Sequence, residues 1–319
     1  MGTYVLRRLL LMIPTLLGVA LMVFMLLRFT GGDVADLLLA ETQAAHDPVM
    51  KEQIRKDLGL TGSPVTQFGS WVAGISTADF GKSYYSGRQV RGDLAERLPV
   101  TLELGVLAIC LSMLIGIPIG AVSALRQDTW LDYLTRGGAI MFLSIPSFWT
   151  ALLVLQIGRN QFQWAPPPVY KDLWVDPIQN LYIMATPVLI LGISLAAIQA
   201  RFFRAQMLEV MRQDYIRTAR AKGLSGSVVV FRHALKNAFI PVITVIGLQI
   251  PVAITGTLIL EIIFLIPGVG RLLVDAARRN DYPIVQAVTL VVATSVVFVN
   301  LLIDLSYAFL DPRVKEAYR

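Results

Sequence analysis

The stretch Asp214-Tyr-Ile-Arg-Thr-Ala-Arg-Ala-Lys-Gly223 is a short basic segment between two strongly apolar parts of the chain. Hydrophobic residues make up 55% of the 319 residues and charged residues only 16%, and the mean hydropathy is +0.63. This composition lies well away from that of a soluble globular domain. The sequence therefore predicts an all-α integral membrane protein in which segment 214–223 is an amphipathic helix on the cytoplasmic face.

Segments apolar enough to cross a bilayer, which takes about 20 residues, divide the chain into four regions. Residues 1–28 hold the N-terminus and first span, 29–98 form an extracytoplasmic segment, 99–310 form a five-helix core with a loop at 201–240, and 311–319 form a cytoplasmic tail. The six predicted spans lie near 9–28, 99–125, 137–158, 181–200, 241–264 and 286–310.

Lysine and arginine are unevenly shared between the short loops on the two sides of these spans. One side holds Arg7, Arg8, Arg126, Arg136, Arg201, Arg204, Arg212, Arg217, Arg220, Lys222, Arg232, Lys236, Arg313, Lys315 and Arg319, whereas the short loops on the other side hold Arg159, Lys171, Arg271, Arg278 and Arg279. Because cytoplasmic loops carry the excess of basic residues, both termini are assigned to the cytoplasm. The net charge of +6 then needs no nucleic-acid partner.

Cysteine and histidine are too few for a metal site. The chain has one cysteine, Cys110, and two histidines, His46 and His233. No internal disulfide and no Cys/His metal cluster can be built from them. We expect Cys110 to pack inside a span.

The stretch Ser76-Thr-Ala-Asp-Phe-Gly-Lys-Ser83 comes within one residue of a phosphate-binding loop, whose first position is glycine. Such a loop needs a strand before it and a helix after it to direct backbone amides at phosphate. Neither flank is predicted here. We interpret 76–83 as an extracytoplasmic turn and expect a non-catalytic chain that binds no cofactor.

Proline and glycine within the spans allow more than one interpretation. The prolines Pro14, Pro118, Pro146, Pro187 and Pro251 indicate kinked helices around a pathway, or the ordinary tolerance of membrane helices for proline. The pair Gly116 and Gly120 is interpreted as packing, because Gly-x-x-x-Gly spacing permits close helix approach.

Charges in or near the spans lie toward span ends, at Arg28, Glu103, Glu261 and Asp304. An ion-driven carrier is expected to place a carboxylate or histidine near the midplane. The sequence shows none there. A membrane-embedded metalloprotease is disfavoured for the same reason, since it needs a His-Glu-x-x-His helix or an equivalent.

The loop 201–240 combines eight basic residues with apolar residues at helical spacing, among them Leu224, Val228 and Phe231. We expect Asp214 to cap a helix that ends at Gly223 in the left-handed conformation. Ser225 begins another helix. A solvated helix is one interpretation; docking to a partner is favoured, because small residues at Thr218, Ala219 and Ala221 leave room for a partner surface.

The residues of this loop carry a resemblance. Segments 214–225 and 232–238 with Pro241 resemble the coupling-loop signature of membrane permease subunits of ATP-binding-cassette (ABC) importers, in the dipeptide, oligopeptide and nickel branch. Further matches are Tyr4-Val-Leu-Arg-Arg8, Leu98-Pro-Val-Thr-Leu-Glu-Leu104, Glu261 with Phe264 and Pro267-Gly-Val-Gly270, Asp281-Tyr-Pro283, Asn300-Leu-Leu-Ile-Asp304 and Asp311-Pro-Arg313. Arg217 and Thr218 stand where the general permease signature has Glu and Ala, and Pro241 falls later than in that signature.

This resemblance implies a type I ABC importer permease in the cytoplasmic (inner) membrane of a bacterium or archaeon. It implies a second permease, usually a different chain, two cytoplasmic ATPase subunits that bind ATP and Mg, and an extracytoplasmic solute-binding protein. The helix from about Asp214 to Leu224 would enter a cleft of one ATPase subunit. Segments 29–98 and 265–285 would face the binding protein or cover the outer gate.

The candidate site residues follow from this assignment. ATPase contact is expected from Tyr215, Arg217, Thr218, Ala219, Arg220, Ala221, Lys222 and Gly223, and Ser144, Ser147, Gln249 and Thr255 are weaker candidates for the translocation pathway. Polar residues in spans also bond across helices for packing alone, and that interpretation is the better supported for the second group.

Two other classes of function stay open on the residues. An ion-coupled secondary transporter would show uptake without ATP. A membrane scaffold or channel that docks a cytoplasmic partner would explain the basic helix equally well, but not the matches at both ends of the chain. The identity of the carried solute is not encoded in any motif.

Overall fold

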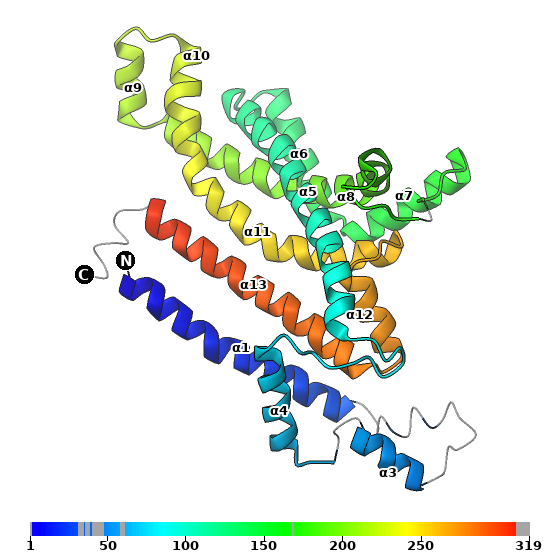
Figure 1. Cartoon of the computed structure of the whole chain (residues 1–319). Helices are drawn as coiled ribbons and strands as arrows, with labels where there is room; N and C mark the ends of the chain where they lie inside the picture. Colours follow the sequence, from blue (N-terminus) through cyan, green and yellow to red (C-terminus); the bar gives the residue numbers. More distant parts are fainter. Residues whose placement is uncertain are drawn as a thin grey trace. The chain divides into compact units, whose positions relative to one another are not determined.

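The computed structural model describes residues 2–30, 35, 39, 48–57, 61–167 and 169–310, and it is helical nearly throughout (Figure 1). The predicted tail 311–319 and His46 lie outside the described residues. The only β pairing in the described ranges is an isolated bridge between Lys82 and Gln89. The all-α prediction is confirmed.

In chain order the helices are α1 (Gly2–Thr30), α3 (Pro48–Asp57), α4 (Pro64–Ser76), α5 (Val90–Leu125), α6 (Trp130–Ser144), α7 (Ser147–Phe162), α8 (Pro177–Met211), α9 (Asp214–Ala221), α10 (Gly226–Val228), the π-helical turn η1 (Val229–Ala234), α11 (Leu235–Ile263), α12 (Val269–Arg278) and α13 (Tyr282–Leu310).

Five helical segments in the described residues are long and apolar enough to cross a membrane. These candidate spans are Arg8–Met25, Val90–Leu125, Pro177–Met211, Gly226–Ile263 and Tyr282–Ile303, and the bent pair α6 and α7 makes up to six. The predicted count of six spans is reached when the bent pair counts as one span.

The prediction of one continuous span at 137–158 is wrong. Helices α6 and α7 are bent by 92° to each other at a short break. Ile145 ends α6 in an extended conformation (φ −99°, ψ 118°), as expected for the residue before a proline. Pro146 then precedes the first residue of α7. The pair is either a broken span or a re-entrant loop.

The described chain divides into two compact units. The first unit contains Pro99–Gly270 and the chain from Phe298 onward, and the second contains Gly2–Leu98 and Arg271–Val297. Each unit holds its own set of internal contacts.

The first unit is built around α8 and α11, with α6 and α7 packed against α8. One apolar cluster joins α5, α8 and α11 through residues such as Leu104, Leu191 and Leu260. A second cluster lies around Phe203 and Met207 of α8. Cys110 lies inside the candidate span α5 as predicted, but its side chain is exposed, so the expectation that it packs there is wrong.

Close packing of α5 on α8 depends on glycine. A Cβ built on Gly116 would lie 2.7 Å from the carbonyl oxygen of Ala196, and one on Gly120 would lie 2.5 Å from that of Ala200. Real Cβ atoms do not approach so closely, so any larger residue would push the helices apart. The packing role predicted for this glycine pair is confirmed.

Three buried polar contacts join the helices of the first unit. Asp132 of α6 is fully buried and accepts hydrogen bonds from Nε (2.7 Å) and Nη2 (2.6 Å) of Arg204 in α8. Gln199 of α8 donates to Gln249 of α11 (2.7 Å) and to Ser112 of α5 (2.9 Å). Buried polar groups are stable in apolar surroundings only when they are paired in this way.

The third contact is made by Glu261 at the end of α11. Its fully buried carboxylate accepts hydrogen bonds from Oγ1 of Thr101 (2.6 Å) and from the backbone N of Gly270 (2.7 Å) at the start of α12. A Cβ on Gly268 would collide with the same carboxyl group. Glu261 thus holds the turn between α11 and α12 against α5.

The second unit contains α1, α4 and the hairpin turn that precedes α5. Phe24 of α1 packs against Phe68 and Trp71 of α4, with ring centroids 5.3 and 6.0 Å away. The stretch 76–83 follows the end of α4 and enters the turn closed by the bridge between Lys82 and Gln89. It has neither a strand before it nor a helix directly after it, which confirms its interpretation as a turn.

Candidate functional site

Helix α9 is short and sharply bounded. Gln213 precedes it in an extended conformation, and no side chain caps its first turn. Asp214 is the first helical residue, and its carboxylate accepts a hydrogen bond from Nη1 of Arg217 (3.3 Å). The expectation that Asp214 caps the helix is therefore wrong. At the other end Gly223 has φ +78°, which confirms the predicted left-handed turn, and Ser225 directly precedes α10 as predicted.

One face of α9 is buried within the protein. Ile216 is fully buried and Ala219 is 7% exposed. Both belong to the apolar cluster formed by Phe203 and Met207 of α8, Val229 and Ala234 of η1, and Ala238 and Val242 of α11. Ala219, predicted to leave room for a partner, instead lets α9 approach its own chain. Figure 1 shows α9 and α10 together near the start of α11.

The other predicted contact residues of α9 lie on its free face. Exposed side chains or backbone are found at Tyr215, Arg217, Thr218, Arg220, Ala221, Lys222 and Gly223. The hydroxyl of Tyr215 accepts a hydrogen bond from Nδ2 of Asn237 in α11 (3.0 Å). The basic face is therefore attached to α11 by a polar contact as well as by the apolar cluster behind it.

Exposed apolar residues follow α9 in the chain, in the loop after it, in α10 and in η1. Phe231 is 74% exposed, and Leu224 and Val228 are about 40% exposed. The sequence predicts these residues as part of an apolar stripe at helical spacing and gives no signal that assigns Phe231 to the site. Phe231 lies in the π-helical turn η1 and is exposed like Leu224 and Val228, so the predicted apolar stripe lies on the surface here. A partner that fits this surface would combine acidic or carbonyl groups with an apolar patch.

Three of the four candidate pathway residues, Ser144, Gln249 and Thr255, make local or interhelical hydrogen bonds. Oγ of Ser144 donates to the carbonyl oxygen of Ile140, and Oγ1 of Thr255 donates to that of Pro251. Gln249 is 3% exposed and links α11 to α8. Ser147 begins α7 directly after the break. These contacts are those expected of packing for Ser144, Gln249 and Thr255, and the pathway role of the four residues stays a prediction.

Comparison with known proteins bears on the whole chain. Residues 116–316 match the family of the binding-protein-dependent transport system inner membrane component, and residues 1–105 match the N-terminal domain model of the corresponding membrane components. The chain belongs to this family. It is a binding-protein-dependent permease subunit, and α9 with its exposed basic face lies inside the matched range.

Relatives of this permease align with it over nearly their full lengths. The dipeptide transport system permease protein DppB of Alkalihalophilus pseudofirmus is 38% identical over 99% of this chain and 100% of its own length. The glutathione transport system permease protein GsiC of Pectobacterium atrosepticum is also 38% identical, over 99% of both chains. The oligopeptide transport system permease protein AppB of Bacillus subtilis is 36% identical over 99% of this chain and 100% of its own.

The fold of the permease is shared with a solved transporter. A crystal structure titled as an amino acid ABC transporter with histidines superposes with a TM-score of 0.53, at 16% identity, over 67% of this chain and 92% of the other. This similarity supports the ABC permease fold. Together the findings make the chain a multi-pass transport subunit of an ABC importer.

Proposed function

We propose that this permease subunit forms half of the translocation pathway of a peptide importer in the cytoplasmic membrane. Relatives that carry dipeptide, oligopeptide and glutathione in their names align over nearly the whole chain. Dipeptides, oligopeptides and glutathione all contain a peptide bond, so a small peptide is the proposed cargo. The chain itself performs no covalent chemistry in this scheme and binds no cofactor.

The proposed assembly has four other members. A second permease, a different chain, completes the pathway, two cytoplasmic ATPase subunits bind ATP and Mg, and a solute-binding protein delivers the peptide from outside. The family description supports the dependence on a binding protein. We infer the ATPase partners from the exposed basic surface of α9.

The observation that carries the proposal is that α9 has one exposed basic face and one buried apolar face. Its outer face exposes Arg217, Arg220 and Lys222, while Ile216 and Ala219 are buried against the ends of two candidate spans. Burial of one isoleucine side chain stabilises a contact by about 1.5–3 kcal/mol. A force applied to the outer face is therefore transmitted to α8 and α11 rather than absorbed by a free loop.

Substitution of Gly223 tests this coupling. Valine at φ +78° is disfavoured by at least about 1–2 kcal/mol, so Gly223→Val should distort the turn after α9. Gly226→Val is the matched control, because Gly226 has no positive φ and nothing within 4 Å of its Cβ position. Both variants should reach the membrane. We expect Gly223→Val to lose ATP-dependent peptide uptake while the assembled complex still hydrolyses ATP, whereas Gly226→Val should transport normally.

Uptake by Gly223→Val at the level of Gly226→Val would contradict the coupling role of α9. The partners are tested separately by affinity purification of the wild-type chain from its native membrane in mild detergent, followed by mass spectrometry. Recovery of ATPase subunits, a second permease and a binding protein supports the proposed assembly. Uptake that persists without ATP would favour an ion-coupled carrier instead.

A further inference from the structure

Helix α4 is an uncharged helix in a charged part of the chain. No Lys, Arg, Asp or Glu occurs between Asp57 and Asp79, although the segment 29–98 otherwise carries both signs of charge. The helix has 13 residues, and its polar side chains are hydroxyls and one amide. An apolar helix of about 10–14 residues is too short to cross the hydrocarbon core and is typical of a buried core helix or of a helix at the membrane interface.

The burial of α4 excludes the first of these two settings. None of its residues is buried, whereas a core helix buries its apolar side chains. Phe68 and Trp71 are partly exposed and contact α1. The exposed residues Val65, Gly69 and Ala73 follow one another at a spacing of four and lie on one face of the helix. We call these three residues the free face of α4.

The contact with α1 sets the depth of α4 in the membrane. The ring of Phe24 packs on Phe68 and Trp71, and Phe24 lies one residue before the end of the candidate span Arg8–Met25. The distribution of basic residues assigns the start of this span to the cytoplasm, so Phe24 lies at its extracytoplasmic end. Helix α4, which lies beside α1 in Figure 1, is therefore at the outer boundary of the hydrocarbon.

The hydroxyl groups of α4 and of the residue that follows it are satisfied within the segment. Each donates to a backbone carbonyl oxygen three residues earlier: Thr66 to Ser63 (2.7 Å), Ser70 to Gln67 (3.0 Å), Ser76 to Ala73 (2.6 Å) and Thr77 to Gly74 (2.9 Å). The amide of Gln67 donates to the carbonyl oxygen of Gly62 (2.7 Å). Polar side chains bonded in this way need no water, which suits a helix partly in lipid.

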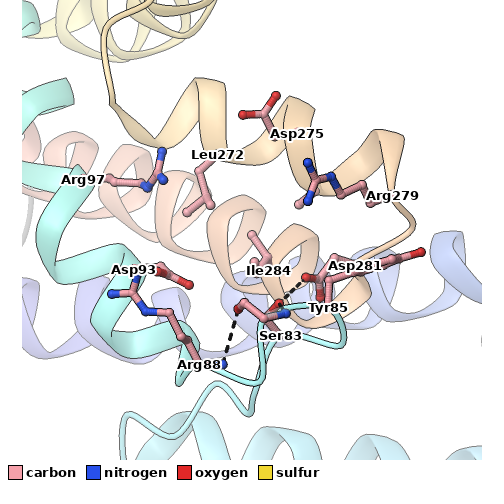
Figure 2. A pocket seen from close by; sticks show the side chains of 12 residues that line it. Ser83, Tyr85, Arg88, Asp93, Arg97, Leu272, Asp275, Arg279, Asp281 and Ile284 are labelled. Carbon is pink, nitrogen blue, oxygen red and sulfur yellow. Dashed lines mark hydrogen bonds and ion pairs between the residues drawn. The ribbon is translucent and has the colours of Figure 1, made fainter. Parts of the chain in front are cut away.

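The charged side chains of the second unit gather in a different place. Figure 2 shows a pocket whose charged lining residues are Arg88, Asp93, Arg97, Asp275, Arg279 and Asp281. None of the residues that line this pocket comes from α4. Oγ of Ser83, in the turn after α4, donates to the carboxylate of Asp281 (2.5 Å). The chain on either side of α4 is thus held, by α1 and by this hydrogen bond, while α4 itself stays uncharged.

We propose that α4 lies in the outer interface of the lipid bilayer and that its free face contacts lipid. Helices at this interface place apolar side chains at the boundary between headgroups and acyl chains, where tryptophan and phenylalanine are favoured. Because α4 has no charged side chain, apolar burial holds it there, and no anionic headgroup is required. Helix α4 then anchors the extracytoplasmic segment to the membrane surface. This inference is independent of the proposed cargo.

Spin labels on single cysteines test the proposal. Cys110→Ser removes the only cysteine of the chain, and Val65→Cys or Ala73→Cys then places one label on the free face. Glu52→Cys, exposed in the charged helix α3, is the aqueous control, and Leu114→Cys, 73% exposed in the candidate span α5, is the membrane control. The purified chain is placed in phosphatidylcholine nanodiscs. Power saturation measures the access of each label to oxygen, which concentrates in lipid, and to a water-soluble nickel chelate.

We expect the labels at positions 65 and 73 to resemble the membrane control, with a ratio of oxygen access to chelate access severalfold above that of the label at position 52. A ratio equal to that at position 52 would show a solvated helix and overturn the proposal. Access to neither reagent would show that protein covers the free face, and would also overturn it. The same labels are then measured in the complex with its co-purified partners, where loss of oxygen access would assign the face to another subunit instead of lipid.

Fluorescence of the native chain gives a second test that needs no label on the free face. The wild type and Trp71→Phe are compared in nanodiscs whose lipids carry bromine either near the headgroup end of the acyl chain or near its middle. We expect Trp71→Phe to remove part of the quenching, and to remove more of the quenching by bromine near the headgroups. Identical quenching of the two proteins by both lipids would place Trp71 away from lipid and contradict the interfacial position of α4.

Discussion

Replacement of Gly120 by alanine should loosen the packing of α5 on α8. The added Cβ would lie 2.5 Å from the carbonyl oxygen of Ala200 and 3.0 Å from Cβ of Phe203. Heavy atoms in favourable contact are about 3.5–4.0 Å apart, so the two helices must separate by about 1 Å or bend. Overpacking of this kind costs about 1–3 kcal/mol.

Helix propensity acts in the opposite direction and must be separated from the clash. Alanine is favoured over glycine in a helix interior by about 1 kcal/mol. Gly138→Ala in α6 is the matched control, because no atom lies within 4 Å of the Cβ position of Gly138. The propensity gain is common to both variants, and their difference reports the clash alone.

The assay is thermal inactivation of the purified chain in detergent, followed as loss of the monodisperse peak in size-exclusion chromatography. With about 2 °C per kcal/mol for a large domain, Gly120→Ala should melt about 2–6 °C below Gly138→Ala. Equal melting temperatures for the two variants would refute the conclusion that glycine is required at this helix crossing.

Three further predictions concern buried or partly buried polar groups. Glu261→Gln should destabilise the chain by about 1–3 kcal/mol, because one of the two oxygens that accept a hydrogen bond would become an NH₂ group, which cannot accept one. The melting temperature of the variant in detergent, compared with that of the wild type, measures this loss. Asp132→Asn should cost about 3 kcal/mol because Arg204 would lose its charge partner in a buried site, whereas the double replacement Asp132→Asn with Arg204→Met should recover part of the loss in the same assay. Burial and the hydrogen bond to Glu103 raise the pKa of Tyr170. Its contribution to stability is therefore complete below about pH 10 and falls as the pH rises above that value, so Tyr170→Phe should flatten the alkaline decline in melting temperature.

Local sequence was sufficient to predict the features that depend on a few neighbouring residues. The apolar runs predicted the spans because bilayer thickness sets a minimum length for each one. Gly223 predicted the turn after α9 because glycine adopts positive φ without a steric penalty. The basic exposed face of α9 followed from the same stretch.

Proline positions show where local reasoning stopped. Pro118, Pro187 and Pro251 lie inside continuous helices, whereas the chain breaks at Pro146. The proline ring removes one hydrogen bond in every case. Whether a helix continues past a proline then depends on which neighbouring groups donate to the freed carbonyl and pack against the helix on both sides of the proline. The flanking residues do not determine this.

The sequence by itself determined the membrane class of this protein, its division into apolar spans, the basic segment at 214–223 and the family to which it is similar. Only the tertiary structure decided that Ala219 faces its own chain, that Thr101 and Glu261 meet, and that Arg97 and Arg279 line one pocket. Composition and periodicity carry information about residues that lie within one or two helical turns of each other. Contacts between residues distant in the chain depend instead on how packed helices bring their faces together.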